Sequence, residues 1–167
     1  HFTMRNLVVY FLLVAGTALA QQPEAATTIF LVRHAEKADQ TDASPLTDRG
    51  KARAEKLAET LRDANVQTVY STNFVRTRET ARPLAEKRGL TVQTYDGHDA
   101  NFANTLLKAH EGQRVLVVGH SNTIPKLVNA LAGTSLPNLT DTEYDALFVV
   151  TVPRRGPPTA LTLRLNP

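Results

Sequence analysis

Two apolar segments far apart in the chain end in the same way, at a histidine. The first runs from Ile29 to Val32 and is followed by Arg33-His34, and the second runs from Val115 to Val118 and is followed by Gly119-His120. Unbroken aliphatic runs of this kind are typical of strands covered on both faces of a sheet, and ligands of open α/β sheets bind beyond the carboxyl ends of such strands. If the two strands are parallel, both histidines lie in one crevice, which Arg33 makes cationic and suited to an anion.

Strand and helix patterns alternate along most of the chain. Strands are predicted over residues 27–33, 66–70, 90–95 and 115–119, and helices over residues 47–64, 76–88 and 102–109 and around Pro125. Pro83 predicts a kink or a late start in the second helix. Residues 146–152 and 159–165 predict a hairpin at an antiparallel edge. Together these patterns predict an α/β fold, a three-layer αβα sandwich with a mostly parallel sheet.

The amino terminus has the layout of a secretory signal peptide. Residues 1–3 precede Met4 and are interpreted as a tag remnant or an upstream start. A short basic region ends at Asn6, residues 7–15 are almost wholly apolar, and Ala18-Leu19-Ala20 has the small-residue spacing of a cleavage site. This apolar stretch is shorter than the ~20 residues that span a bilayer. We therefore expect cleavage after Ala20, a periplasmic or secreted protein with no stable membrane anchor, and a single domain over residues 21–167.

Composition narrows the classes of partner. The chain has no cysteine, which excludes disulfides, a thiolate nucleophile and a lipid-bearing cysteine. The net charge is +3, and removal of residues 1–20 takes away Arg5 and no acidic residue, leaving +2. Basic and acidic residues alternate over residues 51–62, which is typical of a solvated helix face, so no nucleic-acid partner is expected. The edge hairpin is compatible with a monomer or a dimer.

Four motifs in order along the chain resemble one family of enzymes. They are Leu31-Val32-Arg33-His34-Ala35-Glu36, Leu46-Thr47-Asp48-Arg49-Gly50, Ser71-Thr72-Asn73-Phe74-Val75-Arg76-Thr77 with Thr80-Ala81, and Gly119-His120-Ser121-Asn122. In this order they resemble the histidine phosphatase superfamily, the phosphoglycerate-mutase-like group, and within it the small single-domain phosphatases. The resemblance spans about Ile29 to Val152 and implies the αβα fold of that group.

The resemblance also implies a reaction and a set of site residues. It implies hydrolysis of a small phosphorylated substrate, a phosphomonoester, through a phosphohistidine on His34. Arg33, Arg76 and His120 would bind the phosphoryl oxygens, so neither a metal nor a cofactor is implied. Nearby arginines are expected to lower the pKa of His34 and keep its ring neutral. Lys37 and Asn122 are expected to line the substrate side of the site, whereas His98 and His110 are interpreted as loop or surface residues.

The leaving oxygen needs a proton, and the family places a carboxylic acid just after the third strand. Asp96 is the first choice for this proton donor, Asp99 the second, and Glu36, two residues beyond His34, the third. Either aspartate could instead cap the helix that begins near Ala100.

Three other functions share some of these residues. A mutase-like phosphotransferase would use the same phosphate contacts, although mutases carry long insertions and this chain is near the minimal length. A noncatalytic module that binds a phosphorylated ligand would keep the cationic pocket, but an intact His34 favours an enzyme. A metallohydrolase built from the histidines and Glu36 lacks any paired-ligand spacing. The motifs leave the physiological substrate open.

Overall fold

The computed structural model of the chain describes residues 25–166. The predicted tag remnant and signal peptide, residues 1–20, lie outside the described residues. Within residues 25–166, no helix is long and apolar enough to cross a membrane.

A six-stranded mixed sheet forms the centre of the molecule, in the order β3-β2-β4-β1-β5-β6. The first four strands in this order are parallel to one another, whereas β5 and β6 are antiparallel and lie at one edge, as predicted. The strands are β1 (Thr27–Arg33), β2 (Thr68–Ser71), β3 (Val92–Thr94), β4 (Arg114–Gly119), β5 (Ala146–Val152) and β6 (Thr159–Arg164).

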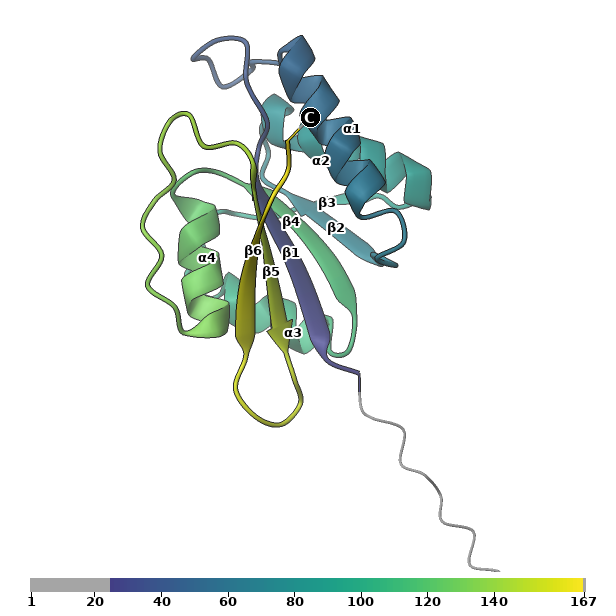
Figure 1. Cartoon of the computed structure of the whole chain (residues 1–167), viewed down its shortest axis with the longest axis vertical. Coiled ribbons are helices and arrows are strands. Elements are labelled where there is room, and N and C mark those ends of the chain that lie inside the picture. Colours follow the sequence, from purple (N-terminus) through teal and green to yellow (C-terminus); the bar gives the residue numbers. More distant parts are fainter. Residues whose placement is uncertain (1–24, 167) are drawn as a thin grey trace, which may run out of the picture.

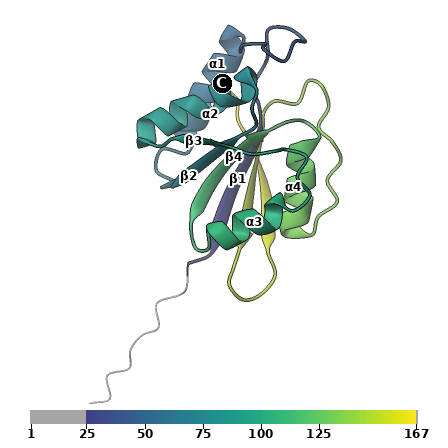
Figure 2. The same ribbon diagram turned by 180° about the vertical axis from the view of Figure 1, so that it is seen from behind.

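Helices cover both faces of this sheet (Figures 1 and 2). Helices α1 (Asp48–Thr60) and α2 (Val75–Arg88) lie on one face, and α3 (Phe102–Ala109) and α4 (Thr123–Ala132) lie on the other. Side chains of β1 alternate between two cores: Ile29 packs on the α3 and α4 side, and Phe30 packs on the α1 and α2 side. Burial on both faces explains the unbroken apolar run and confirms the three-layer αβα sandwich.

Helix ends follow the cues in the sequence, with small differences. Thr47 caps α1 by accepting a hydrogen bond from the Gly50 amide, and Gly89 ends α2 in the left-handed conformation with φ 64°. Helix α2 begins at Val75 and includes Pro83, so the late start is wrong. Strand β3 is shorter than the predicted residues 90–95, because only three of its residues pair with β2 at the sheet edge.

His110 lies in the loop just after α3, as interpreted from the sequence, but it is not on the surface. Its side chain is buried. Its Nε2 lies 2.9 Å from the Tyr70 hydroxyl and its Nδ1 lies 2.9 Å from Oε1 of Gln113. The turn into β4 folds this ring beneath β2, which no local pattern indicates.

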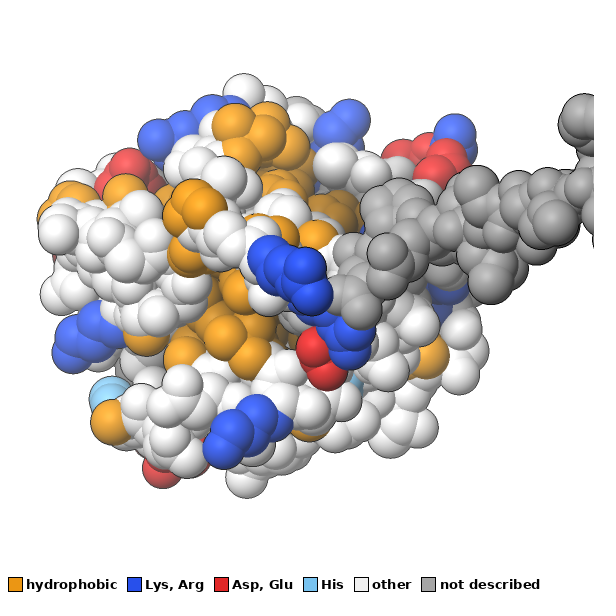
Figure 3. All heavy atoms as spheres, turned by 90° about the horizontal axis from the view of Figure 1, so that it is seen from below, with side chains coloured by type: hydrophobic (Ala, Val, Ile, Leu, Met, Phe, Trp, Pro, Cys, Tyr) orange, Lys and Arg blue, Asp and Glu red, His pale blue; other side chains and the backbone are white. Residues whose placement is uncertain are grey.

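The two ends of the sheet differ in surface character. The carboxyl ends of β1 and β4 carry the two histidine motifs. At the opposite end, seen from below in Figure 3, hydrophobic side chains are interspersed with Lys and Arg side chains that stand apart from one another.

Candidate active site

The pairing of β1 with β4 brings the two histidines together. The strands are parallel, and Arg33 lies opposite Gly119 in the register. The His34 amide continues the ladder by donating to the Gly119 carbonyl at 2.8 Å. The ring centroids of His34 and His120 are 5.5 Å apart. The expectation that both histidines share one crevice is confirmed.

His34 presents a neutral ring with one nitrogen free. Its Nδ1 lies 2.7 Å from the Ala35 carbonyl, which only accepts, so Nδ1 carries the hydrogen and Nε2 keeps its lone pair. The pKa of His34 is lowered to about 3, mainly by burial and to a smaller extent by the charges of Arg33 and Arg76. The predicted direction is confirmed, but burial is the larger cause.

Arg33 is buried and held by the loop before β5. Its Nη1 donates to the carbonyls of Thr140 at 2.8 Å and Glu143 at 3.0 Å, and its guanidinium lies 4.0 Å from the centroid of the Tyr144 ring. Its Nε is buried without a hydrogen-bond partner among the described residues. A buried charged donor of this kind is costly unless it binds an anion.

Arg76 stands in the first turn of α2 and repeats this arrangement. Its guanidinium lies 4.5 Å from the centroid of the Phe74 ring, and Nη1 makes long contacts of 3.4 Å to the carbonyls of Thr41 and Asp42. Its Nε is likewise buried with no partner in the described part of the chain. Aromatic rings thus fix both guanidinium groups while leaving donors available to a ligand.

His120 is positioned by the loop that follows β2. Its Nε2 lies 2.8 Å from Oγ1 of Thr72, and its ring meets that of Phe74 edge to face at 5.0 Å. Burial lowers the pKa of His120 to about 4, with Arg76 and His98 adding to the effect. His120 is therefore neutral at pH 7 in the free site.

The threonines of the third motif hold the site together. The Thr77 hydroxyl donates to the Thr72 carbonyl at 2.9 Å, which orders the loop beneath His120. The Thr80 hydroxyl accepts from the Ala35 amide at 2.9 Å and donates to the Arg76 carbonyl at 2.7 Å. Thr80 therefore links the segment after His34 to the turn that carries Arg76.

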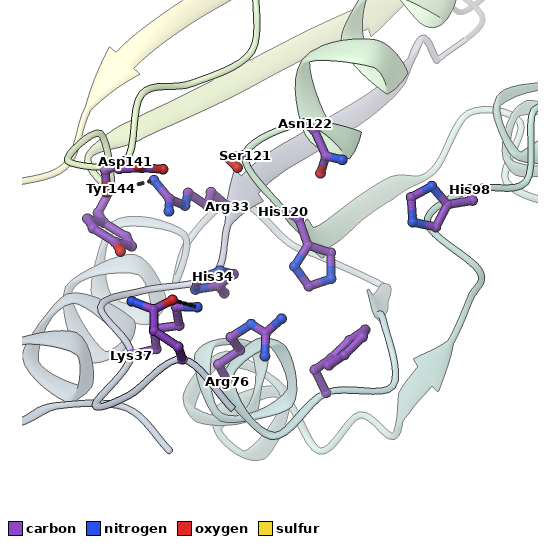
Figure 4. Close-up of a pocket in the computed structure, with 12 residues that line it drawn as sticks. Arg33, His34, Lys37, Arg76, His98, His120, Ser121, Asn122, Asp141 and Tyr144 are labelled. Atoms are coloured by element: carbon purple, nitrogen blue, oxygen red, sulfur yellow. Dashed lines mark hydrogen bonds between the residues drawn. The ribbon is translucent and has the colours of Figure 1, made fainter. Parts of the chain in front are cut away.

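These side chains open into a cavity of about 630 Å³. In Figure 4, Arg33, His34, Arg76 and His120 converge on one space. Lys37 and Asn122 line the cavity, as expected from the sequence. The cavity is also lined by six residues that the sequence analysis did not assign to the site, namely Gln40, Phe74, His98, Ser121, Asp141 and Tyr144.

The three candidate carboxylates lie outside this lining. Asp96 lies on an adjoining cavity that shares His120, and its Oδ1 accepts from the His98 amide at 2.9 Å. Asp99 Oδ1 accepts from the Asn101 amide at 2.9 Å in the turn before α3, but the N-cap residue of α3 is Asn101 and no side chain among the described residues caps this helix, so the capping alternative is wrong. Glu36 binds the buried Arg53 through both carboxylate oxygens, at 2.7 Å and 3.0 Å.

The described residues contain no group of three or more His, Asp or Glu side chains arranged to hold a metal ion. Glu36, a member of the metallohydrolase alternative, is engaged by arginines. The chemistry that the arrangement supports is binding of an oxyanion by fixed donors beside an unprotonated imidazole nitrogen.

Comparisons with known proteins point to one family of enzymes. A model described as "Histidine phosphatase superfamily (branch 1)" matches residues 29–98. The lipopolysaccharide core heptose(II)-phosphate phosphatase of Salmonella typhimurium is 30% identical over 123 residues, covering 66% of this chain and 61% of the relative. The phosphatase of the same name from Salmonella schwarzengrund is 29% identical over 149 residues, which cover 81% of this chain and 72% of the relative. The chain thus spans about 61% of the length of most curated relatives that it matches.

Solved structures share the fold. The protein histidine phosphatase SixA, in a complex with tungstate, superimposes with a TM-score of 0.68 at 21% identity, covering 82% of this chain and 96% of SixA. A mycobacterial glucosyl-3-phosphoglycerate phosphatase superimposes with a TM-score of 0.61 at 15% identity, covering 75% of this chain and 90% of that phosphatase. At these identities the likeness establishes the architecture.

Proposed function

Because this chain belongs to the histidine phosphatase superfamily, we propose that it hydrolyses phosphomonoesters through a phosphohistidine on His34. The observation that carries the proposal is the unprotonated Nε2 of His34 in one cavity with Arg33 and Arg76, whose buried Nε donors have no partner among residues 25–166. A nucleophile and fixed cations that bind phosphoryl oxygens are what phosphoryl transfer needs from a protein. The phosphatase names of the curated relatives support the same reaction class.

In the first step, the lone pair of His34 Nε2 forms a bond to phosphorus while the bond from phosphorus to the leaving oxygen breaks. The electron pair of that bond goes to the leaving oxygen, which takes up a proton from solvent water and departs as an alcohol. Arg33, Arg76 and His120 bind the three equatorial oxygens and stabilise the charge that they carry. No further group is required for esters whose leaving oxygen is weakly basic.

In the second step, water attacks phosphorus and the bond between His34 Nε2 and phosphorus breaks. The electron pair returns to Nε2, and inorganic phosphate leaves. The hydrogen bond from Nδ1 to the Ala35 carbonyl keeps Nε2 directed at the phosphoryl group throughout both steps. None of the three carboxylates considered from the sequence, Asp96, Asp99 and Glu36, lines the cavity that holds His34.

Hydrolysis of 4-nitrophenyl phosphate by the full chain, with and without EDTA, tests the proposal. We expect activity that EDTA leaves unchanged, that His34→Ala abolishes, and that Lys56→Ala on the exposed face of α1 preserves. Acid-labile, base-stable phosphate on the protein in rapidly quenched reactions would identify the phosphohistidine. Activity that survives His34→Ala would overturn the proposal.

The same assay separates the alternatives. Binding of inorganic phosphate with no turnover of any ester would indicate a noncatalytic module. Transfer of the phosphoryl group to an added acceptor alcohol in preference to water would indicate a mutase-like phosphotransferase. One set of reactions therefore contains glycerol, which competes with water as the acceptor of the phosphoryl group.

We propose further that the protein is exported to the periplasm or medium. The support is the basic, apolar and small-residue succession over residues 4–20. Expression in a bacterium with a periplasm, followed by fractionation and mass measurement, should give a soluble periplasmic protein that begins at Gln21. Leu12→Arg, which breaks the apolar stretch, should retain the protein in the cytoplasm. A cytoplasmic protein with an intact amino terminus would contradict export.

A further inference from the structure

A second cavity adjoins the phosphate-binding cavity. It measures about 470 Å³ and shares Phe74, His98 and His120 with the first. Figure 4 shows His98 on the far side of His120 from His34, so the shared wall leads away from the nucleophile. A group attached to a phosphate held by Arg33 and Arg76 has this second cavity beside it.

The chemistry of the two cavities differs. Arg33, Lys37 and Arg76 line the first. In the described part of the chain, no Lys or Arg lines the second, whose one carboxylate is that of Asp96. A leaving group with its own phosphate or carboxylate would meet repulsion from Asp96, while the Arg78 guanidinium, which binds Asn73 Oδ1, lies outside the lining.

The polar groups of the second cavity suit hydroxyl groups. Asn73 supplies the NH2 group of its side-chain amide, whose Oδ1 accepts from Arg78, and Thr94 supplies a hydroxyl; both residues are exposed. Asp96 uses Oδ1 to accept from the His98 amide, while Oδ2 has no partner assigned in the structure. The Phe74 ring adds an apolar surface beside these groups. An aromatic ring flanked by amide, hydroxyl and carboxylate groups matches the apolar and hydroxylated faces of a sugar.

The wall of the second cavity is held in place by the core. The Tyr95 amide donates to the Ser71 carbonyl at 3.1 Å, and the Tyr95 ring stacks on Phe102 with centroids 4.3 Å apart. Gly97 lies close to the loop after β2, because a Cβ there would be 3.2 Å from Cγ2 of Thr72. The loop that carries Asp96 and His98 is therefore positioned before a ligand binds.

We propose that the second cavity is the leaving-group subsite and that it takes a neutral, hydroxyl-rich group such as a sugar, with Asp96 accepting from its hydroxyls. This inference rests on the proposed phosphomonoesterase activity and names its substrate class. Asp96 lies on the second cavity and not on the cavity with His34. It therefore contacts the body of the leaving group, at a distance from the leaving oxygen.

Three substrates with alkyl leaving oxygens test the subsite: glucose 6-phosphate, ethyl phosphate and 3-phosphoglycerate. All three release primary alcohols, but only glucose 6-phosphate fills the second cavity with neutral hydroxyls, whereas 3-phosphoglycerate brings a carboxylate. We expect the full chain to prefer glucose 6-phosphate in kcat/KM. In Asp96→Ala this preference should fall by about tenfold or more, the size expected for a lost hydrogen bond to a charged group. Thr91→Ala, at an exposed position outside the cavity, is the matched control.

The activity on an anionic substrate, 3-phosphoglycerate, gives a second readout. Asp96→Asn removes the negative charge, so we expect its kcat/KM for 3-phosphoglycerate to rise while that for ethyl phosphate stays constant. Equal losses on glucose 6-phosphate and ethyl phosphate would overturn the inference and favour Asp96 as the proton donor. Hydrolysis of 4-nitrophenyl phosphate that depends on His34, without any preference between the first two substrates, would refute the subsite alone. No hydrolysis of any ester would refute the proposed function itself.

Discussion

The guanidinium of Arg33 lies against the ring of Tyr144, with 4.0 Å between its central carbon and the ring centroid. The two residues come from different strands' ends: Arg33 closes β1, and Tyr144 precedes β5. Antiparallel pairing of Val32 with Leu147 brings these positions side by side. The ring and the backbone carbonyls of the 140–143 loop thus hold Arg33 from one side and leave the other side for phosphate.

Removal of this ring should weaken phosphate binding. We expect Tyr144→Ala to raise the inhibition constant for inorganic phosphate by about 3- to 30-fold, the range that a cation–π contact of roughly 0.5–2 kcal/mol supports. Tyr144→Phe keeps the ring and should remain within about twofold of the wild type, since the contact with Arg33 uses the ring face. Equal weakening in both variants would show that the hydroxyl, and not the ring, matters for phosphate.

Stability should depend on pH through the two neutral histidines. Burial lowers the pKa of His34 to about 3 and that of His120 to about 4, whereas unfolded histidine titrates near 6.5. Between these values the unfolded chain binds more protons, so the free energy of unfolding falls as the pH drops. Each histidine lowers it by at most about 1.4 kcal/mol per pH unit, and His120 by less because it is partly exposed.

Urea denaturation at pH 7 and pH 5 measures this effect. Asp and Glu side chains with ordinary pKa values stay largely ionised between pH 5 and pH 7, so histidines dominate the change in the free energy of unfolding. We expect a lower midpoint at pH 5, and a smaller difference in the double variant His34→Asn, His120→Asn, which has no imidazole at either position. A double variant with the same pH dependence as the wild type would contradict this account.

The strands that carry the histidines were predictable because an apolar run without alternation fits a strand that is buried on both faces. Leu31 and Val32 fill opposite cores of the sheet, and each strand ends where its polar residues begin. Arg76 and Thr80 were predictable only through the resemblance, because a lone arginine at a helix start carries no signal of its own.

The contributions of Asp141 and Tyr144 to the site were not predictable. Their loop has no motif, and it reaches the site through the pairing of β5 with β1 and a hydrogen bond from the Leu139 amide to the Ser121 carbonyl at 2.9 Å. The carboxylate assignments depended on sequence distance from His34 and from the third strand. Distance along the chain does not report which side of a loop faces a cavity, which is why Asp96 and Asp99 required the structure.

The third prediction concerns Glu36, whose role likewise could not be inferred from its distance to His34 along the chain. Its carboxylate binds the buried Arg53, which also donates to the Leu165 carbonyl. We expect Glu36→Gln to lower the free energy of unfolding by roughly 3 kcal/mol, since it leaves a buried charge without its counterion. Arg49→Gln removes the exposed partner of Glu36 and should cost less than about 1 kcal/mol.

Urea denaturation of both variants checks this ranking, with ester hydrolysis as a second readout. In Glu36→Gln, losses of activity should be the same for 4-nitrophenyl and ethyl phosphate. Unchanged stability together with a selective loss on ethyl phosphate would instead make Glu36 the proton donor.

The fourth prediction concerns the close approach of α1 to the segment after His34. A Cβ on Gly50 would lie 2.4 Å from the Glu36 carbonyl oxygen and 3.1 Å from the Glu36 amide nitrogen, so backbone must move to admit it. We expect Gly50→Ala to cost about 1–3 kcal/mol in urea denaturation, as overpacking does, and to lower kcat for 4-nitrophenyl phosphate by displacing Ala35 and His34. Lys51→Ala, exposed on the same turn, should change stability by less than about 0.5 kcal/mol and leave kcat unchanged. The atoms that a Cβ on Gly50 would meet are backbone atoms of Glu36, so the clash cannot be relieved by a side-chain rotation. A Gly50→Ala protein with wild-type stability and kcat would therefore show that α1 does not hold the segment after His34 in place.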